Sequence, residues 1–405
     1  MDVALTMEAA TPIALRAGRA TAGSETLHWV PGTVLLGAMA EAHQLLRPDS
    51  RDEFAAFFLH GRVQMGNGYP ATFPTTQDAL RNPMKLLAPL PATARSCKRW
   101  SGFRYQSDDE HEYHGVSDHL LAWAIFALSG ETDATLLHEL DSCPECGESM
   151  EAISGYYRWG HTHAEIGRPS ERVALHSRTG INRATGAVQD GILYSRQELV
   201  QGTVFHAHLW VDDTLADDFR AFLTEAGHAG LWRVGTARTR GLGALRHIGS
   251  AELTNPRGTV DEVGARVKEF DRRLRQLAGE RGIQTPHARY VALTLHSDIV
   301  LPNRVLRWRT RLDADVLDEH GLPGAHLLYH SARLTRSMSW NAVLGLPRPD
   351  AIAIAQGAVF LFGFATDPDI GALERVQRRG LGVRREGGYG RFMVADPFHW
   401  EVTNA

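Results

Sequence analysis

Cysteines with the spacing of a metal site lie in the first half of the chain. Cys143 and Cys146 stand in the turn sequence CPECG, and Cys97 is the only other cysteine among the 405 residues. A closed set of four nitrogen or sulfur ligands is typical of structural zinc, so three thiols leave one place for a histidine. We favour His114 because it precedes a predicted helix; the other candidates are His111, His119, His161 and His163.

Two other interpretations of the cysteines stay open. They could form a redox pair or be inert thiols, although a redox Cys-x-x-Cys usually opens a helix after a strand, which Asp141 and Ser142 do not indicate. Residues 1–15 carry no basic start followed by an apolar core, and an odd number of cysteines favours a reducing cytoplasm. No apolar run reaches membrane-spanning length, so we expect a cytoplasmic protein without a membrane partner.

Phosphate recognition is the second chemistry that the sequence offers. Two segments, residues 232–245 and 380–394, thread arginines between glycines. Glycine lets the backbone take positive φ and approach a ligand closely, and guanidinium groups suit phosphate oxygens. Ordinary hairpin turns and solvated arginines would leave the same pattern, but the repetition favours a duplicated unit that grips a polyanion with both segments on one side. Neither segment is a dinucleotide fingerprint or a nucleotide P-loop.

Catalytic residues are harder to find. Metal-free cleavage of RNA needs a base for the 2′-hydroxyl proton and an acid for the leaving oxygen, and His28 is the best candidate base. The sequence singles out no acid to work with it. Asp190 stands beside Gly191, where turn chemistry explains it. A zinc enzyme would need an open coordination position and a nearby acid, and no HExxH motif is present. We therefore expect no catalysis.

A basic hairpin is predicted between the cysteine motif and the first glycine segment. Alternating segments over residues 175–196 flank a turn at residues 183–186. Arg178, Asn182 and Arg183 give the hairpin a polar, basic character. It is either a solvated loop or a finger that lies along an extended nucleic-acid strand.

The remaining elements recur in two halves. ALTL at residues 292–295 echoes ALTM at 4–7, and GAVF at 357–360 echoes GTVF at 202–205. Helices predicted at 217–226 and 370–379 precede the two glycine segments, and Thr33 is expected to cap a helix at 34–46. This order predicts two homologous α+β domains. Their expected bounds are 1–254, with an insertion at about 71–165, and 288–405, with a helical connector at 255–287.

Composition agrees with a soluble globular chain. Apolar residues make up 43% and charged residues 22%, and the length suffices for two domains with separate cores. The net charge of −4 gives no global basic field, so any polyanion must be met by local patches. Arginine outnumbers lysine, which either favours bidentate phosphate contacts or reflects a GC-rich genome.

The constellation resembles the RAMP superfamily of CRISPR proteins. The stretches VPGTVLLGAMA, FFLHGRVQMGNGYP, SRTGINRATGAVQDGILYS and AIAQGAVFLF, with Cys97, CPEC and both glycine segments, are similar to the large two-domain RAMP subunit of type III-D effector complexes. The resemblance implies two tandem ferredoxin-like, RRM-related domains with a zinc-stapled insertion in the first. It also implies a non-catalytic subunit that holds the 5′ repeat-derived handle of CRISPR RNA, with a RAMP endoribonuclease that processes repeat RNA as the alternative.

The resemblance further implies partners and contact residues. The partners would be CRISPR RNA, other RAMP backbone subunits and the large polymerase-like subunit of the effector. The second glycine segment is expected to be longer than the first, and Glu386 within it weakens its expected phosphate contact. The RNA-contacting residues would be Arg178, Asn182 and Arg183 on the hairpin, Arg238, Arg240, Gly241 and Gly243 in the first segment, and Arg384, Arg385, Gly388, Gly390 and Arg391 in the second.

Overall fold

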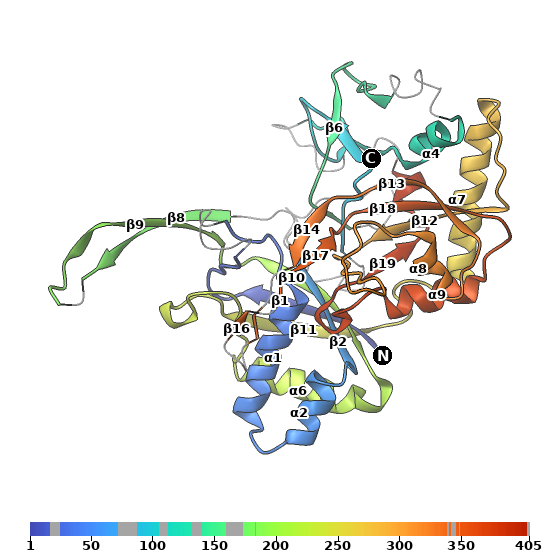
Figure 1. The fold of residues 1–405 in the computed structure, drawn as a ribbon. Helices are drawn as coiled ribbons and strands as arrows, with labels where there is room; N and C mark the ends of the chain where they lie inside the picture. The colour runs from blue at the N-terminus through green and yellow to red at the C-terminus, as the bar shows by residue number, and fades with distance from the viewer. Residues whose placement is uncertain are drawn as a thin grey trace.

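The protein, described by a computed structural model, has a mixed α+β fold with several antiparallel sheets (Figure 1). The structure describes residues 1–16, 25–71, 87–104, 112–130, 140–158, 173–182, 184–337, 340–341, 346–347 and 349–402. No helix in these ranges is long and apolar enough to cross a membrane.

The first half is built on a four-stranded antiparallel sheet in the order β11-β1-β10-β2. Its helices α1, α2 and α6 gather together, and their apolar side chains share one core with the sheet (Figure 1). The bounds are β1 Asp2–Ala9, α1 Gly32–Leu46, α2 Arg51–Phe58, β2 Val63–Pro70, β10 Val204–Val211, η3 Asp213–Leu215, α6 Ala216–His228, η4 Arg238–Arg240 and β11 Leu245–Leu253.

The second half repeats this plan with the strand order β13-β18-β12-β19. In chain order, each sheet is made as strand, helix, strand, strand, helix, strand, and the first and third of these strands are central. The bounds are α7 Val260–Glu280, β12 Arg289–Leu295, α8 Ala314–Asp318, β13 Ala325–Ser331, β18 Val359–Phe364, α9 Ile370–Arg379, η5 Arg385–Gly387, β19 Phe392–Val394 and α10 Phe398–Glu401.

Backbone contacts of the two halves correspond residue by residue. Gly202 donates its N–H to Ala9 O, and Gly357 donates its N–H to Leu295 O, both at 2.8 Å. GTVF and GAVF are therefore in structural register, as the sequence predicts. ALTM and ALTL are not in register, because Ala9 corresponds to Leu295 and ALTM ends two residues before Ala9.

Two hairpins occupy corresponding places between the second and third strands of their sheets. The first is formed by β8 (Val173–Ile181) and β9 (Val188–Leu199) and projects far from the body (Figure 1). The second is formed by β14 (Leu334–Ser337) and β17 (Ala351–Ile354), with β15 (Trp340–Asn341) and β16 (Leu346–Pro347) paired beyond them. The predicted hairpin at residues 175–196 is thus present, longer at each end.

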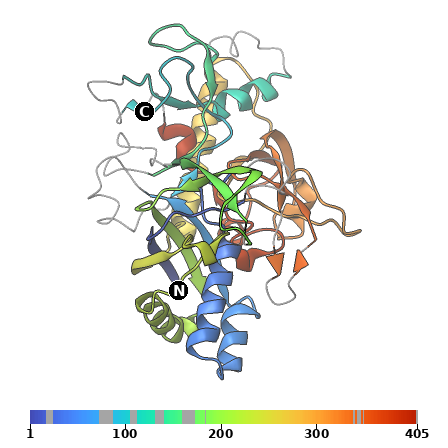
Figure 2. The ribbon, with the colours of Figure 1, turned by 90° about the vertical axis from the view of Figure 1, so that its left-hand side faces the viewer.

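The insertion interrupts the first half in sequence, between β2 and β8, but packs largely on the second half in space. Its helix α4 (Leu120–Leu128) shares a core with α7 and the second sheet, and Figure 2 shows this region at the opposite end from α1. Its short strands are β3 Ala88–Pro89, β4 Ala94–Cys97, β5 Val116–Asp118, β6 Met150–Ala152 and β7 Tyr156–Tyr157. This packing differs from the expectation that the insertion is fastened to the first domain.

The connector helix and the first helix also differ from expectation. α7 begins at a capping box formed by Thr259 and Glu262, and its apolar side is fully buried, so it belongs to the second core rather than to a separate connector. Thr33 does not cap α1. Instead, Oδ1 of Asn67 on β2 accepts the N–H of Gly32 at 2.9 Å, so a side chain distant in sequence satisfies one N–H at the start of this helix.

Candidate nucleic-acid interface and metal cluster

The first glycine turn, residues 235–243, is a compact loop with a short 3-10 helix at its tip. Ala237 and Gly241 flank this helix with φ of 57° and 84°. The loop is closed by the N–H of Val234, which donates to Gly243 O at 2.8 Å. A Cβ on Gly243 would overlap Val234 O, so the last glycine is required by close backbone approach.

The second glycine turn, residues 382–390, has the same backbone geometry. Arg384 and Gly388 flank its 3-10 helix with φ of 64° and 88°, and Leu381 donates its N–H to Gly390 O at 2.9 Å. The two turns therefore have the same length, and the expectation of a longer second turn is wrong. Glu386 occupies the position that Thr239 has in the first turn.

The surroundings of the two turns differ sharply. Arg238, Arg240 and Gly241 are exposed in the first turn. In the second, Gly388 is buried against β2 of the first half, where its Cβ would lie 2.6 Å from Met65 O. The expectation that both turns open on one side is wrong for Gly388, because this part of the second turn packs between the halves.

The first glycine turn is bonded to the projecting hairpin. Nη1 of Arg240 donates to the hydroxyl of Tyr194 on β9 at 2.9 Å. Tyr194 is paired across the hairpin with Arg178, so one phenol neighbours two predicted RNA-contacting arginines. Tyr194 is 38% exposed, which leaves part of its ring available to a ligand.

The base of the hairpin carries more positive charge than Glu198 neutralises. Glu198 is 1% exposed and contacts His176, Arg178 and Arg196 at 2.7–3.3 Å. Burial alone would raise the pKa of Glu198, but its bonds to Arg196 and His176 and the charge of Arg178 hold that pKa below its usual range. Two arginines thus share one carboxylate, which leaves a basic surface near Tyr194.

The predicted metal ligands come together in the insertion. The donor atoms of Cys97, His114, Cys143 and Cys146 all lie within 4.8 Å of one another. Cys97 Sγ and Cys146 Sγ are 3.6 Å apart, close to the roughly 3.8 Å between sulfurs in a tetrahedral zinc site with Zn–S of about 2.3 Å. The four residues could hold a metal ion.

The local fold prepares this cluster for a thiolate ligand. Cys97 ends β4, and the turn after Cys143 is closed by the N–H of Gly147, which donates to Cys143 O at 2.8 Å. Burial raises the pKa of the Cys143 thiol, but the N–H groups of Glu145 and Cys146, and His114 at 3.4 Å, lower it to about 7. A thiolate is therefore accessible near neutral pH.

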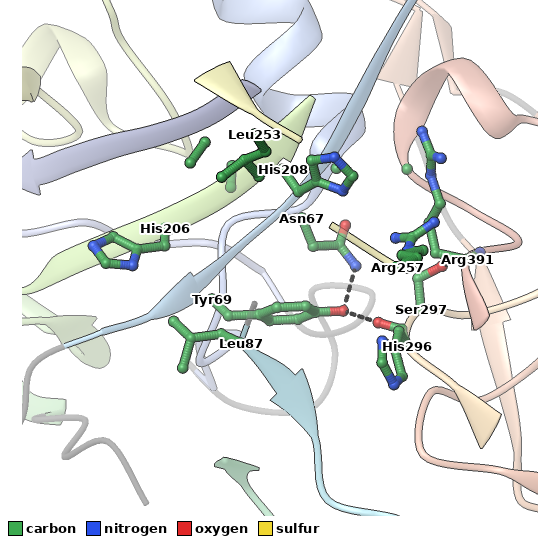
Figure 3. Close-up of a pocket in the computed structure, with 14 residues that line it drawn as sticks. Asn67, Tyr69, Leu87, His206, His208, Leu253, Arg257, His296, Ser297 and Arg391 are labelled. Carbon is green, nitrogen blue, oxygen red and sulfur yellow. Dashed lines mark hydrogen bonds between the residues drawn. The ribbon is translucent and has the colours of Figure 1, made fainter. Parts of the chain in front are cut away.

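A small cavity lies at the seam between the two sheets (Figure 3). Tyr69 crosses it, and its hydroxyl donates to His296 O at 2.5 Å and receives a hydrogen bond from Asn67 at 3.0 Å. The side chains of Arg257 and Arg391 approach the same space. Arg257 is not among the residues predicted from the sequence, because it stands in a turn with no motif around it.

Arg391 has little exposure for a predicted RNA-contacting residue. It is 5% exposed, and its Nη2 donates to Oε1 of Gln64 on β2 of the first half at 2.8 Å. Its guanidinium group therefore bridges the halves, and any contact with RNA would have to be made through the cavity.

His399 in the second half makes contacts like those of a catalytic triad, but it is buried away from any substrate. His399 lies 2.6 Å from Oγ1 of Thr294 and 3.0 Å from Oδ1 of Asp118. Thr294 and His399 are 0% and 2% exposed, so a substrate could not reach them. The contacts instead join the insertion to the second core. His28, the candidate base, is exposed on the first half.

The other predicted residues serve the local structure of the hairpin and the second turn. Asn182 shapes the hairpin tip, where its Oδ1 accepts the N–H of Ala184 at 2.9 Å. Arg384 donates from Nη1 to Oγ of Ser337 at 2.9 Å, which ties the second turn to the second hairpin. Arg385 is partly buried beside α9, and Gly390 is buried.

The alternative metal ligands do not join the cluster in the part of the chain that the structure describes. His119 is buried against Ser117, outside the cluster. His111, His161 and His163 lie outside the described residues, as does Arg183 of the hairpin.

Comparison with known proteins gives structural matches only. No protein-family model matches the chain, and no curated protein matches it. A type III-B Cmr-beta structure with cognate target RNA and AMPPnP is similar, with 10% identity, coverage of 89% of this chain and 86% of that chain, and a TM-score of 0.36. A Cas6 product complex has 12% identity, coverage of 77% and 100%, and a TM-score of 0.31. At these TM-scores the likeness carries no argument, so the proposals below rest on the sequence resemblance and on the geometry of this chain.

Proposed function

We propose that the chain is a non-catalytic, RNA-binding subunit of a type III CRISPR effector of the III-D kind. In this proposal it consists of two tandem ferredoxin-like domains and holds the 5′ repeat-derived handle of CRISPR RNA. The observation that carries the proposal is the bond between Arg240 and Tyr194, which joins the exposed first glycine turn to the basic hairpin.

The surface formed by the first glycine turn and the hairpin suits single-stranded RNA. Arg178, Arg238 and Arg240 offer guanidinium groups to phosphates, and Tyr194 offers an aromatic face on which a base could stack. The hairpin arm gives this surface length, so several nucleotides could lie along it. RAMP backbone subunits and the large polymerase-like subunit are the expected neighbours.

We further propose that the ion held by Cys97, His114, Cys143 and Cys146 is zinc in a structural role. Three thiolates and one imidazole fill a tetrahedral shell, which leaves no position for a reacting water. When bound, the metal would tie the turn at Cys143 to strand β4 and so fix the insertion that packs on the second core.

The direct test is incubation of the purified chain with labelled repeat RNA, with and without EDTA. The proposal predicts that the handle is bound more tightly than a scrambled RNA of equal length and that both stay intact. Cleavage of the repeat that is lost in His28→Ala would instead favour the RAMP endoribonuclease.

A further inference from the structure

The cavity at the seam between the halves contains cations without matching anions. Arg257 and Arg391 line it, and none of the described residues on its wall is acidic (Figure 3). Like charges in a poorly solvated space repel each other, so an arrangement of this kind is costly unless an anion enters.

Among the described residues, neither guanidinium group is bonded to a carboxylate. Arg391 bonds neutral oxygens, those of Gln64 at 2.8 Å and of the Arg378 carbonyl at 3.4 Å. Nε of Arg257 is buried and has no hydrogen-bond partner within the described part of the chain. Burial lowers the pKa of Arg257 to about 10 and that of Arg391 to about 9, and the charge of Arg257 contributes to the latter.

The negative charge that acts on both arginines is already engaged. Asp2 attracts both of them, but its Oδ1 is bonded to Nε2 of His208 at 2.8 Å. Burial lowers the pKa of His208 to about 4, so this imidazole is neutral near pH 7 and the single charge of Asp2 can balance only one of the two arginines. Among the residues that the structure describes, the lining of the cavity therefore carries two guanidinium groups and no carboxylate.

Size and geometry select the anion. The cavity volume is about 50 Å³, well below the roughly 150 Å³ of an engineered protein cavity that holds benzene. This space has room for a small oxyanion and not for a nucleoside. Planar guanidinium forks match the oxygens of phosphate, and Ser297 lies on the same wall.

We infer that the cavity is a binding site for one phosphate group, held by Arg257 and Arg391 at the seam between the two halves. The group could be a backbone phosphate of RNA or a free phosphate. Only the first source rests on the proposed function. A phosphate bound by both arginines would also stabilise the contact between the two halves.

The test uses the full chain, inorganic phosphate and Arg257→Gln, which removes one charge at a partly exposed residue. ³¹P NMR should show that the wild-type protein broadens the phosphate signal and that Arg257→Gln does not. Arg304→Gln, which removes an exposed charge elsewhere, should broaden it as the wild type does. Phosphate should also raise the Tm of the wild type more than that of Arg257→Gln at equal ionic strength, since general salt effects act on both.

Equal broadening by wild type and Arg257→Gln, or none by the wild type, would overturn the inference.

A final arm adds single-stranded handle RNA. Loss of the broadening identifies a backbone phosphate as the natural occupant, whereas bound RNA with unchanged broadening identifies free phosphate. Because the phosphate experiment contains no RNA, its result is independent of whether the chain binds the handle.

Discussion

Arg240 and Tyr194 are joined by a 2.9 Å hydrogen bond across 46 residues of sequence. The bond fixes the tip of the first glycine turn against the hairpin and makes one surface from two elements. The hydroxyl of Tyr194 bonds Arg240 and its ring offers a stacking face, so two substitutions can remove them one after the other.

Substitutions of Tyr194 should weaken RNA binding in two steps. Tyr194→Phe removes only the hydroxyl, and we expect RNA affinity to fall about 2- to 10-fold because one modest hydrogen bond is lost. Tyr194→Ala also removes the aromatic face and should cost about 10-fold or more, as roughly 1–3 kcal/mol of base stacking is lost. Fluorescence anisotropy with handle RNA measures both, and wild-type affinity in Tyr194→Ala would contradict the stacking role.

Corresponding glycines in the two turns should tolerate alanine differently. Gly241 and Gly388 have φ of 84° and 88°, so alanine costs about 1–2 kcal/mol of backbone strain at either. A Cβ on Gly241 meets no atom within 4 Å, whereas one on Gly388 would lie 2.6 Å from Met65 O. Gly388→Ala should therefore lower the Tm more than its matched control Gly241→Ala. Equal shifts in thermal denaturation would show that the second turn does not pack the halves together.

Removal of a metal ligand should destabilise the insertion. Cys146 is exposed, so Cys146→Ser changes little packing but removes one thiolate. We expect metal analysis to give close to one zinc per wild-type chain and less in the variant, with a lower Tm that EDTA does not lower further. Glu148→Gln, an exposed change beside the same turn, is the control. A metal-free wild-type protein whose Tm is unaffected by EDTA would refute the zinc proposal.

The buried carboxylate of Asp396 should make the free energy of unfolding depend on pH in the acid range. Burial alone would raise the pKa of Asp396, but His296 at 2.9 Å and the N–H of Phe398 lower it to about 2. A lowered folded-state pKa gives stability that is present above the unfolded value near 4 and is lost as pH falls toward 2. Asp396→Asn should cost about 2 kcal/mol of unfolding free energy at pH 7 and progressively less below pH 4. Denaturant titrations across pH check this, and a cost independent of pH would disagree with it.

Much of the local structure could be predicted from the sequence because its signals are local. Alternation around a glycine turn predicted the β8–β9 hairpin, and a Cys-x-x-Cys turn predicted which thiols meet. His114, chosen for its place shortly before a helix, lies in the same cluster. In these cases the deciding residues are close in sequence or have few possible partners.

The rest depended on contacts that no local pattern records. Gly388 looks like Gly241 in sequence, and only the approach of β2 makes it a packing residue. The insertion packs on the second half through Leu120 and Ile125, whose apolar side chains could have covered either sheet. Arg257 has no motif, and its place beside Arg391 follows from the docking of the two halves.

The salt dependence of handle binding tests the central claim most directly. Arg238→Ala with Arg240→Ala should weaken binding and lower the slope of log affinity against log salt by about 1.4, since each phosphate contact to a single strand contributes about 0.7. The control, Arg272→Ala with Arg273→Ala on the exposed side of α7, removes the same charge far from the hairpin and should leave the slope unchanged (Figure 1). A well-folded Arg238→Ala, Arg240→Ala protein with wild-type affinity and slope would contradict the account.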